Sequence, residues 1–274
     1  MTIETLDQLI KALGNNSSRI VIDKGSIIGH AAGNLISLWR AAGVPAQGNI
    51  PGAAALCNHN TLGAIGFTQQ VSPATSYLAQ LFSNNVNSAM VLEIRDRLGQ
   101  MGGLNGTLTT AQTVALDLLT TGGGITPERR GDANYSDVQW FLEWFASTGA
   151  TAAVATVNVT YDDASTGNLA AINLAATRPA GLLIPLVPAV NGQYIRGVNS
   201  VTLNVSTGTA GSFGVIATRV RAVQPQTLAN FTAVSDWQSL GFPDVPNGSC
   251  LMLVTLTSST ASNALRGGGK IAHG

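Results

Sequence analysis

Charge is scarce in this sequence. Only 10% of the 274 residues are charged, and their formal charges cancel to zero. A typical soluble domain carries about 25% charged residues, and surface charge helps to keep a monomer dispersed. A chain this poor in charge therefore predicts that much of its surface is covered by other subunits. The sequence also has no run of Lys and Arg, which argues against a basic patch for nucleic acid.

Long apolar stretches are also missing. No apolar run approaches the roughly 18 residues that a membrane-spanning helix needs. The first residues, MTIETLDQLIKALG, include acidic side chains and lack an apolar secretory core, so they do not predict a signal peptide. We expect no membrane or nucleic-acid partner, and synthesis in the cytoplasm. Cys57 and Cys250 lie far apart in sequence and are expected to be reduced, buried thiols.

Histidine is too sparse to suggest a metal or catalytic centre. Cys57 and His59 form the nearest approach to a metal motif, but a structural zinc ion needs about four ligands. His30 and His273 have no paired spacing with them. A nucleophilic Cys57 served by a distant histidine is the weaker alternative. We therefore expect no catalytic residue, no cofactor, no metal and no enzymatic activity.

Three other motifs have a plain structural interpretation beside a functional one. The residues 129–132 contain an Arg-Gly-Asp tripeptide, which we interpret as a solvated turn in an exposed loop. Asp162 and Asp163, with Asn168, could bind calcium through oxygen ligands, but a turn between strands is favoured. Trp140 and Trp144 could form a platform for sugars if exposed, although two tryptophans on one strand face are more often core residues.

The stretch from Asp137 to Asp163 is the strongest indication of β-structure. Alternating apolar and aromatic residues predict two adjacent strands joined by a turn at residues 147–149. The first strand, VQWFLEWF, is apolar on both faces, so another sheet, the N-terminal segment or a neighbouring subunit must cover its second face. Residues 76–98 are expected to form two further strands with a turn, in preference to a helix.

The N-terminal region offers candidate interface residues. Residues 2–13 are expected to form a short amphipathic helix that Thr2 caps and Gly14 ends. Leu6, Leu9, Ile10 and Leu13 share one face of this helix. A helix this short is unstable alone, so it must dock on this chain or on a neighbour.

The sequence divides into three expected regions. Residues 1–72 hold the helix and an extended arm rich in Gly and Ala, in which Trp39 is the candidate anchor on another subunit. Residues 73–260 contain about eight strands with turns between them, as in an antiparallel two-sheet β-sandwich of the jelly-roll type. Residues 261–274, which contain three consecutive glycines at 267–269, are expected to be a flexible tail.

Several phrases resemble a family of tailed-bacteriophage virion structural proteins. They are ATVNVTYDDASTGN, NSVTLNVSTGTAGSFGV and SLGFPDVPNGSCLMLVTLTSST, with SLWRAAG and PGAAA in the arm. The likeness covers most of the chain from about residue 20 and rests on strand and turn phrases. One phrase departs from the family pattern, because Arg95 stands where an aromatic residue precedes Asp96-Arg97-Leu98.

The resemblance implies a component of a virus particle with no enzymatic activity. A capsid-decorating or cementing protein is the role that we favour. Its partners would be copies of itself, in trimeric clusters, and a major capsid protein. A neck or tail protein of the virion and a carbohydrate-binding surface sandwich remain the alternatives.

Overall fold

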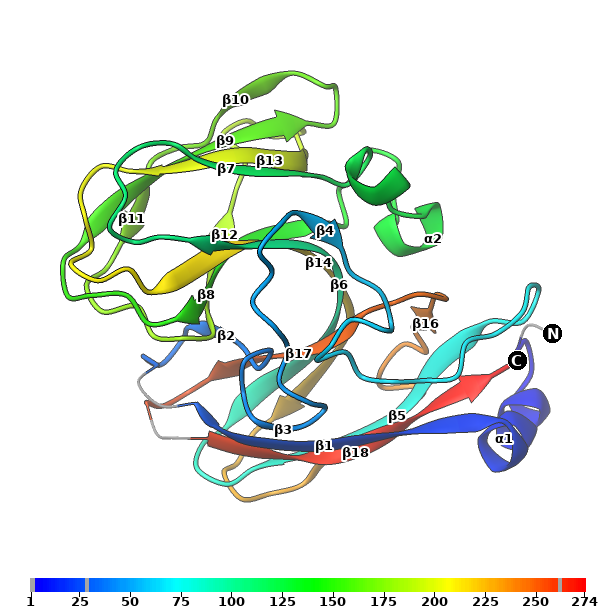
Figure 1. The fold of residues 1–274 in the computed structure, drawn as a ribbon. Helices are drawn as coiled ribbons and strands as arrows, with labels where there is room; N and C mark the ends of the chain where they lie inside the picture. The colour runs from blue at the N-terminus through cyan, green and yellow to red at the C-terminus, as the bar shows by residue number, and fades with distance from the viewer. Residues whose placement is uncertain (1–2, 28–29, 261–262) are drawn as a thin grey trace. The chain divides into compact units, whose positions relative to one another are not determined.

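A computed structural model describes residues 3–27, 30–260 and 263–274 (Figure 1). The chain is mainly β, with antiparallel sheets and little helix. It divides into two compact units. Unit 1 consists of residues 1–48, 58–96 and 220–274, and unit 2 of residues 49–57 and 97–219. Strands β6 (Met90–Leu104) and β14 (Ser212–Gln226) each begin in one unit and end in the other.

Helix α1 (Leu6–Asn15) forms as the sequence predicts, but it begins later. Thr5 and Gln8 form a capping box, in which each side chain accepts a hydrogen bond from the other residue's backbone, so two free N–H groups are satisfied. Thr2, the expected cap, lies outside the described residues. Gly14 lies inside the last turn, and the helix ends where the N–H of Asn16 binds the carbonyl of Ala12.

Unit 1 contains two β-layers with a shared core. One layer has the strand order β15-β5-β18-β1-β3, and β16 also pairs with β5. These strands are β15 (Ala233–Asp236), β5 (Ser76–Asn85), β18 (Asn263–His273), β1 (Ser17–Ile27), β3 (Gly43–Val44) and β16 (Asp244–Val245). In the other layer, β17 (Leu251–Thr257) pairs with β2 (Leu35–Ser37) and with the first part of β6. Leucines and isoleucines from both layers, such as Leu81 and Ile94, form one buried cluster.

The expected C-terminal tail is wrong, because β18 is an interior strand that pairs with β1 on one side and β5 on the other. The glycines of β18 are needed because the backbone of the neighbouring strand lies very close to them. A Cβ atom on Gly267 would lie 2.1 Å from the carbonyl oxygen of Phe82, and one on Gly269 would lie 2.2 Å from that of Gln80. Only glycine fits at such distances, so the three glycines mark a close approach of strands.

Unit 2 repeats the two-layer plan. One layer has the order β10-β9-β13-β7, with β11 also paired to β9. Its strands are β10 (Thr166–Asn168), β9 (Ala153–Tyr161), β13 (Ile195–Leu203), β7 (Gln112–Asp117) and β11 (Ile172–Leu174). In the other layer, β8 (Gln139–Ala146) pairs with β12 (Leu182–Leu186) and β14, and β4 (Ala55–Leu56) pairs with β6. The 3₁₀ turn Thr121–Gly123 and helix α2 (Pro127–Arg130) complete the unit.

Strands β8 and β9 are present near their expected positions, but the prediction that they are adjacent is wrong. They belong to different layers and have different partners. Six consecutive residues of β8 are buried, which confirms that its second face is covered. The mainly antiparallel β-sandwich class that the sequence predicts is confirmed. The compact units do not follow the expected regions, because residues of the expected arm belong to both units.

Candidate functional site

Unit 2 contains an ion pair that is fully removed from water. The guanidinium of Arg97 on β6 lies 2.6 Å from the carboxylate of Glu143 on β8, and both side chains are 0% exposed. Arg97 also donates to Gln100 at 2.8 Å and lies over the ring of Phe145. The Arg97–Glu143 contact is close but not aligned as a hydrogen bond, and within the described part of the chain neither Glu143 oxygen has a hydrogen-bond donor.

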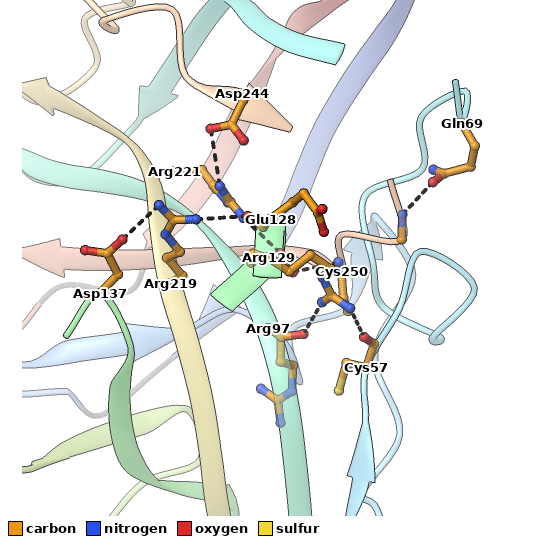
Figure 2. Close-up of polar contacts among 12 residues, drawn as sticks. Cys57, Gln69, Arg97, Glu128, Arg129, Asp137, Arg219, Arg221, Asp244 and Cys250 are labelled. Atoms are coloured by element: carbon orange, nitrogen blue, oxygen red, sulfur yellow. Dashed lines mark hydrogen bonds and ion pairs between the residues drawn. The ribbon is translucent and has the colours of Figure 1, made fainter. Parts of the chain in front are cut away.

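Other buried arginines bind backbone carbonyl groups. Arg129 of α2 donates to the carbonyl oxygens of Cys57, at 2.6 Å, and Arg97, at 3.1 Å (Figure 2). Arg178 donates to Thr148 and to four backbone carbonyls between residues 149 and 175, and burial lowers its pKa. Carbonyl oxygens from strands and loops converge on these two side chains, so both arginines hold separate segments in place.

Unit 1 has a comparable centre around Arg221 on β14. Its guanidinium lies 3.4 Å from Asp96 and 3.4 Å from Asp244, the second contact being drawn in Figure 2. Asp96 also accepts a hydrogen bond from the backbone N–H of Cys250 at 2.9 Å. Asp96 is fully buried and contacts both β14 and the residue before β17, so this centre holds strands together.

The described residues do not gather metal-ligating side chains into one site. Among the described residues no three His, Cys, Asp or Glu side chains lie close enough to hold a metal ion. His273 is buried and contacts two hydroxyls, Ser18 at 2.8 Å and Ser76 at 2.9 Å, and burial lowers its pKa. Cys57, the candidate nucleophile, is 1% exposed. That the protein has no enzymatic activity stays a prediction.

Lys24 on β1 is a buried cation with no acidic partner among the contacts found in the described chain. Its ammonium group donates to the carbonyl oxygens of Ala41, at 3.1 Å, and Pro45, at 2.6 Å. Burial lowers the pKa of Lys24 to about 8. The side chain links β1 to the loops beside β3.

The outer face of the β15-β5-β18-β1 sheet carries an exposed apolar row. The register aligns Val21 with Gly268, Gly268 with Phe82, and Phe82 with Val234. Residues directly opposite one another point to the same face. Val21 is 58% exposed, Phe82 39% and Val234 67%. We call these four residues the apolar row; Figure 1 shows β1, β18 and β5 side by side.

Polar and charged side chains flank the apolar row on both sides. On one side Arg19, Lys270, Gln80 and Asp236 are aligned across the same four strands. On the other side Asp23 is aligned with Arg266, and their charged groups lie 3.5 Å apart at the surface. An apolar centre between polar margins is typical of a protein interface.

Helix α1 covers one end of this sheet. Some of the predicted interface residues on the helix are buried against the sheet, and others are exposed. Leu9 and Ala12 pack on Ala79 and Ala272 of the sheet, and Leu13 lies beside them. Leu6 and Ile10 are 55% and 60% exposed. The helix therefore docks on its own chain and leaves Leu6 and Ile10 free. A hollow of about 170 Å³ lies beside Leu6, lined also by Trp237 and Phe242.

Trp39 is not the exposed anchor on another subunit that the sequence predicts. Its side chain is 2% exposed, so it cannot anchor a neighbouring subunit in this conformation. The indole lies so close to Gly48 that a Cβ atom there would approach the ring to 2.2 Å. The backbone N–H of Gly48 also binds the carbonyl of Trp39 at 2.8 Å. The arm folds over its own tryptophan.

The remaining motifs take their structural interpretations. Trp140 and Trp144 belong to the core of unit 2, so they form no sugar platform. Asp163 accepts hydrogen bonds from Ser165 in a turn, and these bonds lower the pKa of Asp163. The expected exposed loop at 129–132 is partly wrong, because Arg129 is 5% exposed.

The apolar row was not recognised from the sequence. The alternation in Arg19-Ile20-Val21-Ile22-Asp23 is a usable signal of one buried and one exposed face. The alignment of that strand with residues 82, 234 and 268 depends on pairings between distant parts of the chain, which alternation does not specify.

No family model matches the sequence, and no curated protein matches it. Among solved structures, the chain is similar to that of the infectious bursal disease virus Gx strain, with 10% identity and a TM-score of 0.20 over 94% of this chain and 80% of that chain. It is also similar to the VP2 subviral particle of infectious bursal disease virus, with 9% identity and a TM-score of 0.19 over 94% and 79% of the two chains. Scores this low carry no argument about function. No helix among the described residues is long and apolar enough to cross a membrane.

Proposed function

We propose that this chain is a non-enzymatic structural component of a tailed-phage virion, and that it acts as a capsid decoration protein. It would stabilise the head through contacts with copies of itself and with the major capsid protein. The virion phrases in the sequence support this role, together with the shortage of charge. The observation that carries it is the exposed apolar surface of unit 1, formed by the apolar row and by Leu6 and Ile10.

The contacts inside the chain fit a structural role better than a catalytic one. The buried arginines contact carboxylates and backbone carbonyls that hold strands and loops in place. A rigid chain loses little conformational freedom on assembly, so more of each contact contributes to binding. In a symmetric particle every weak contact is repeated many times, and linked contacts bind more strongly than single ones.

Binding to heads that lack this chain tests the proposal. Purified protein should co-sediment with such heads and raise the temperature at which they release DNA. Ile10→Asp should weaken the binding at least tenfold, because it introduces a charge at an exposed apolar contact. Val71→Asp is the matched control, since Val71 is 84% exposed and lies in the same unit. Equal binding by all three proteins would contradict a role for the helix face.

Electron cryomicroscopy of the particle tests the location. Density for this chain on the outer surface of the head supports decoration. Density restricted to the neck or tail would replace it with the alternative of a neck or tail structural protein. Absence of the chain from purified virions would refute both.

A further inference from the structure

We propose that Asn191 and Gly192, in the turn between β12 and β13, are a site of spontaneous deamidation, and that the fold protects the two other Asn-Gly pairs of the chain. The three pairs are residues 105–106, 191–192 and 247–248. Asparagine is one of the thermolabile residues, and a following glycine has no side chain to hinder the reaction. This modification is a property of the chain itself, so it goes beyond the virion role and does not depend on it.

Deamidation joins the side chain of one residue to the backbone of the next. The backbone nitrogen of Gly192 loses its proton to solvent base and attacks the side-chain carbon Cγ of Asn191. The N–Cγ bond forms while the Cγ–Nδ2 bond breaks, and ammonia leaves after it takes a proton from solvent. Water then opens the cyclic imide at either carbonyl group, which gives aspartate or isoaspartate. One water molecule is consumed and one ammonia molecule is released. The reaction is fast only where the two groups are free to meet.

Neither reacting group of the Asn191-Gly192 pair is held in place. Both residues are exposed, and among the described residues no hydrogen bond is found to the Asn191 side chain or to the N–H of Gly192. A hydrogen bond of 3.3 Å from the N–H of Gln193 to the carbonyl of Val190 closes the turn, and it is longer than the usual value of about 2.9–3.0 Å. A Cβ atom on Gly192 would meet nothing within 4 Å. The Asn191 side chain can therefore turn towards the Gly192 nitrogen at little cost.

Both reacting groups of the Asn105-Gly106 pair are held. The Asn105 Oδ1 atom accepts hydrogen bonds from the backbone N–H of Thr107, at 2.8 Å, and from its hydroxyl, at 2.7 Å. The N–H of Gly106 donates to the carbonyl of Ala210 at 2.7 Å. The pair is also enclosed, because a Cβ atom on Gly106 would lie 2.6 Å from the Oγ1 atom of Thr207. Attack on Asn105 requires these contacts to break.

The Asn247-Gly248 pair is held by residues 69 and 70. The Asn247 side chain accepts a hydrogen bond from the N–H of Gln70 at 2.9 Å and donates one to the carbonyl of Gln70 at 2.6 Å. The N–H of Gly248 donates to the side chain of Gln69 at 2.6 Å. Breaking such bonds should slow the reaction about tenfold or more, since a tenfold change in rate corresponds to about 1.4 kcal/mol.

Modification at Asn191 would change the charge and the backbone of its loop. The formal net charge of the chain is zero, so an aspartate at this position gives the chain one negative charge. The exposed side chains of the same loop include Val187 and Val190, so the new carboxylate would lie beside apolar groups. Isoaspartate also adds a carbon atom to the main chain within the turn. Stored protein should therefore separate into an unmodified form and an acidic form.

Peptide mapping of the full chain, kept folded in mildly alkaline buffer at physiological temperature, tests the site. Asn191 should deamidate about tenfold faster than Asn105 or Asn247, or more. An isoaspartate-specific methyltransferase should label the peptide that contains residue 191. Asn191→Gln should abolish the acidic form in anion exchange, because its longer side chain closes a less favourable ring. Asn191→Asp should elute with that form from the start.

The same measurement on chain unfolded in guanidinium chloride separates structure from sequence. The three pairs consist of the same two residues, so their rates should become similar once the hydrogen bonds are lost. Equal rates in the folded chain would overturn the proposal, as would faster reaction at Asn105 or Asn247. A preference for Asn191 that stays unchanged in the unfolded chain would also overturn it, because the hydrogen bonds would then protect nothing. Absence of isoaspartate at residue 191 in folded chain, when the unfolded chain forms it there, would have the same result.

Discussion

Removing either charge of the Arg97–Glu143 pair should destabilise unit 2 by about 3–5 kcal/mol, because the remaining ion is left buried and unpaired. Both side chains are 0% exposed, so no water can take the place of the lost partner. Glu143→Gln keeps the shape of the side chain and removes its charge. Arg97→Met keeps most of the length and removes the cation. Both single variants should lose a similar amount of stability.

The double variant Arg97→Met, Glu143→Leu should behave differently. The pair is 2.6 Å apart but is not aligned as a hydrogen bond, so its attraction offsets the loss of hydration incompletely. Replacing a buried ion pair by apolar residues of similar volume is often neutral, or stabilising by about 1–4 kcal/mol. Gln100 loses its Arg97 donor, which offsets part of any gain. We expect the double variant to be within about 1 kcal/mol of the wild type.

Equilibrium unfolding in urea, followed by tryptophan fluorescence, measures these differences. Trp140 and Trp144 lie in the core of unit 2 and report on its unfolding. The double-mutant cycle gives the coupling energy of the pair directly. Single variants that lose less than about 1 kcal/mol would show that water reaches the pair, since that is the range of exposed ion pairs.

Three further predictions concern unit 1. Burial lowers the pKa of Lys24 to about 8 in the folded state, so the wild type should gain stability relative to Lys24→Met as pH rises from about 8 to about 10.5, where the folded chain releases a proton that the unfolded chain keeps. Equal pH profiles of unfolding would contradict this. Gly267→Ala should cost about 3 kcal/mol, because its Cβ atom would meet the Phe82 carbonyl. Gly66→Ala, with open space around it, is the control. Burial lowers the pKa of His273 in the folded state, so the stability that its neutral imidazole contributes is full above about pH 6.5 and is lost as pH falls through the folded-state pKa. His273→Gln removes this titration, so the free energy of unfolding should fall less steeply below about pH 6.5. An unchanged pH profile of stability would assign the loss to other groups.

Local alternation was enough to predict several elements. Residues 76–98 were predicted to form two strands and a turn, and β5 and β6 confirm this. The apolar run in Gln139–Ala146 correctly indicated a strand covered on both faces. The helix at the N-terminus was also predicted, because its apolar spacing is local. In each case the signal comes from residues that are close in sequence, within one turn of a helix or two apolar–polar alternations of a strand.

Pairing between distant segments was not predictable in the same way. Strands β8 and β9 follow each other in sequence, yet β8 pairs with residues up to 79 positions away, as in Gln139 with Thr218. The three glycines of β18 read as flexible because glycine has two common meanings, freedom of the backbone and close approach of another strand. Only the position of Phe82 and Gln80 on the adjacent strand decides between them.

The shortage of charge at the surface is greater than composition alone indicates. Eight charged side chains among the described residues are buried: Lys24, Arg95, Asp96, Arg97, Arg129, Glu143, Arg178 and Arg221. Charge that fixes strands and loops inside the chain cannot keep its surface hydrated. With few charges at the surface, little opposes the association of exposed apolar groups, and an edge or face that carries such groups tends to bind another surface.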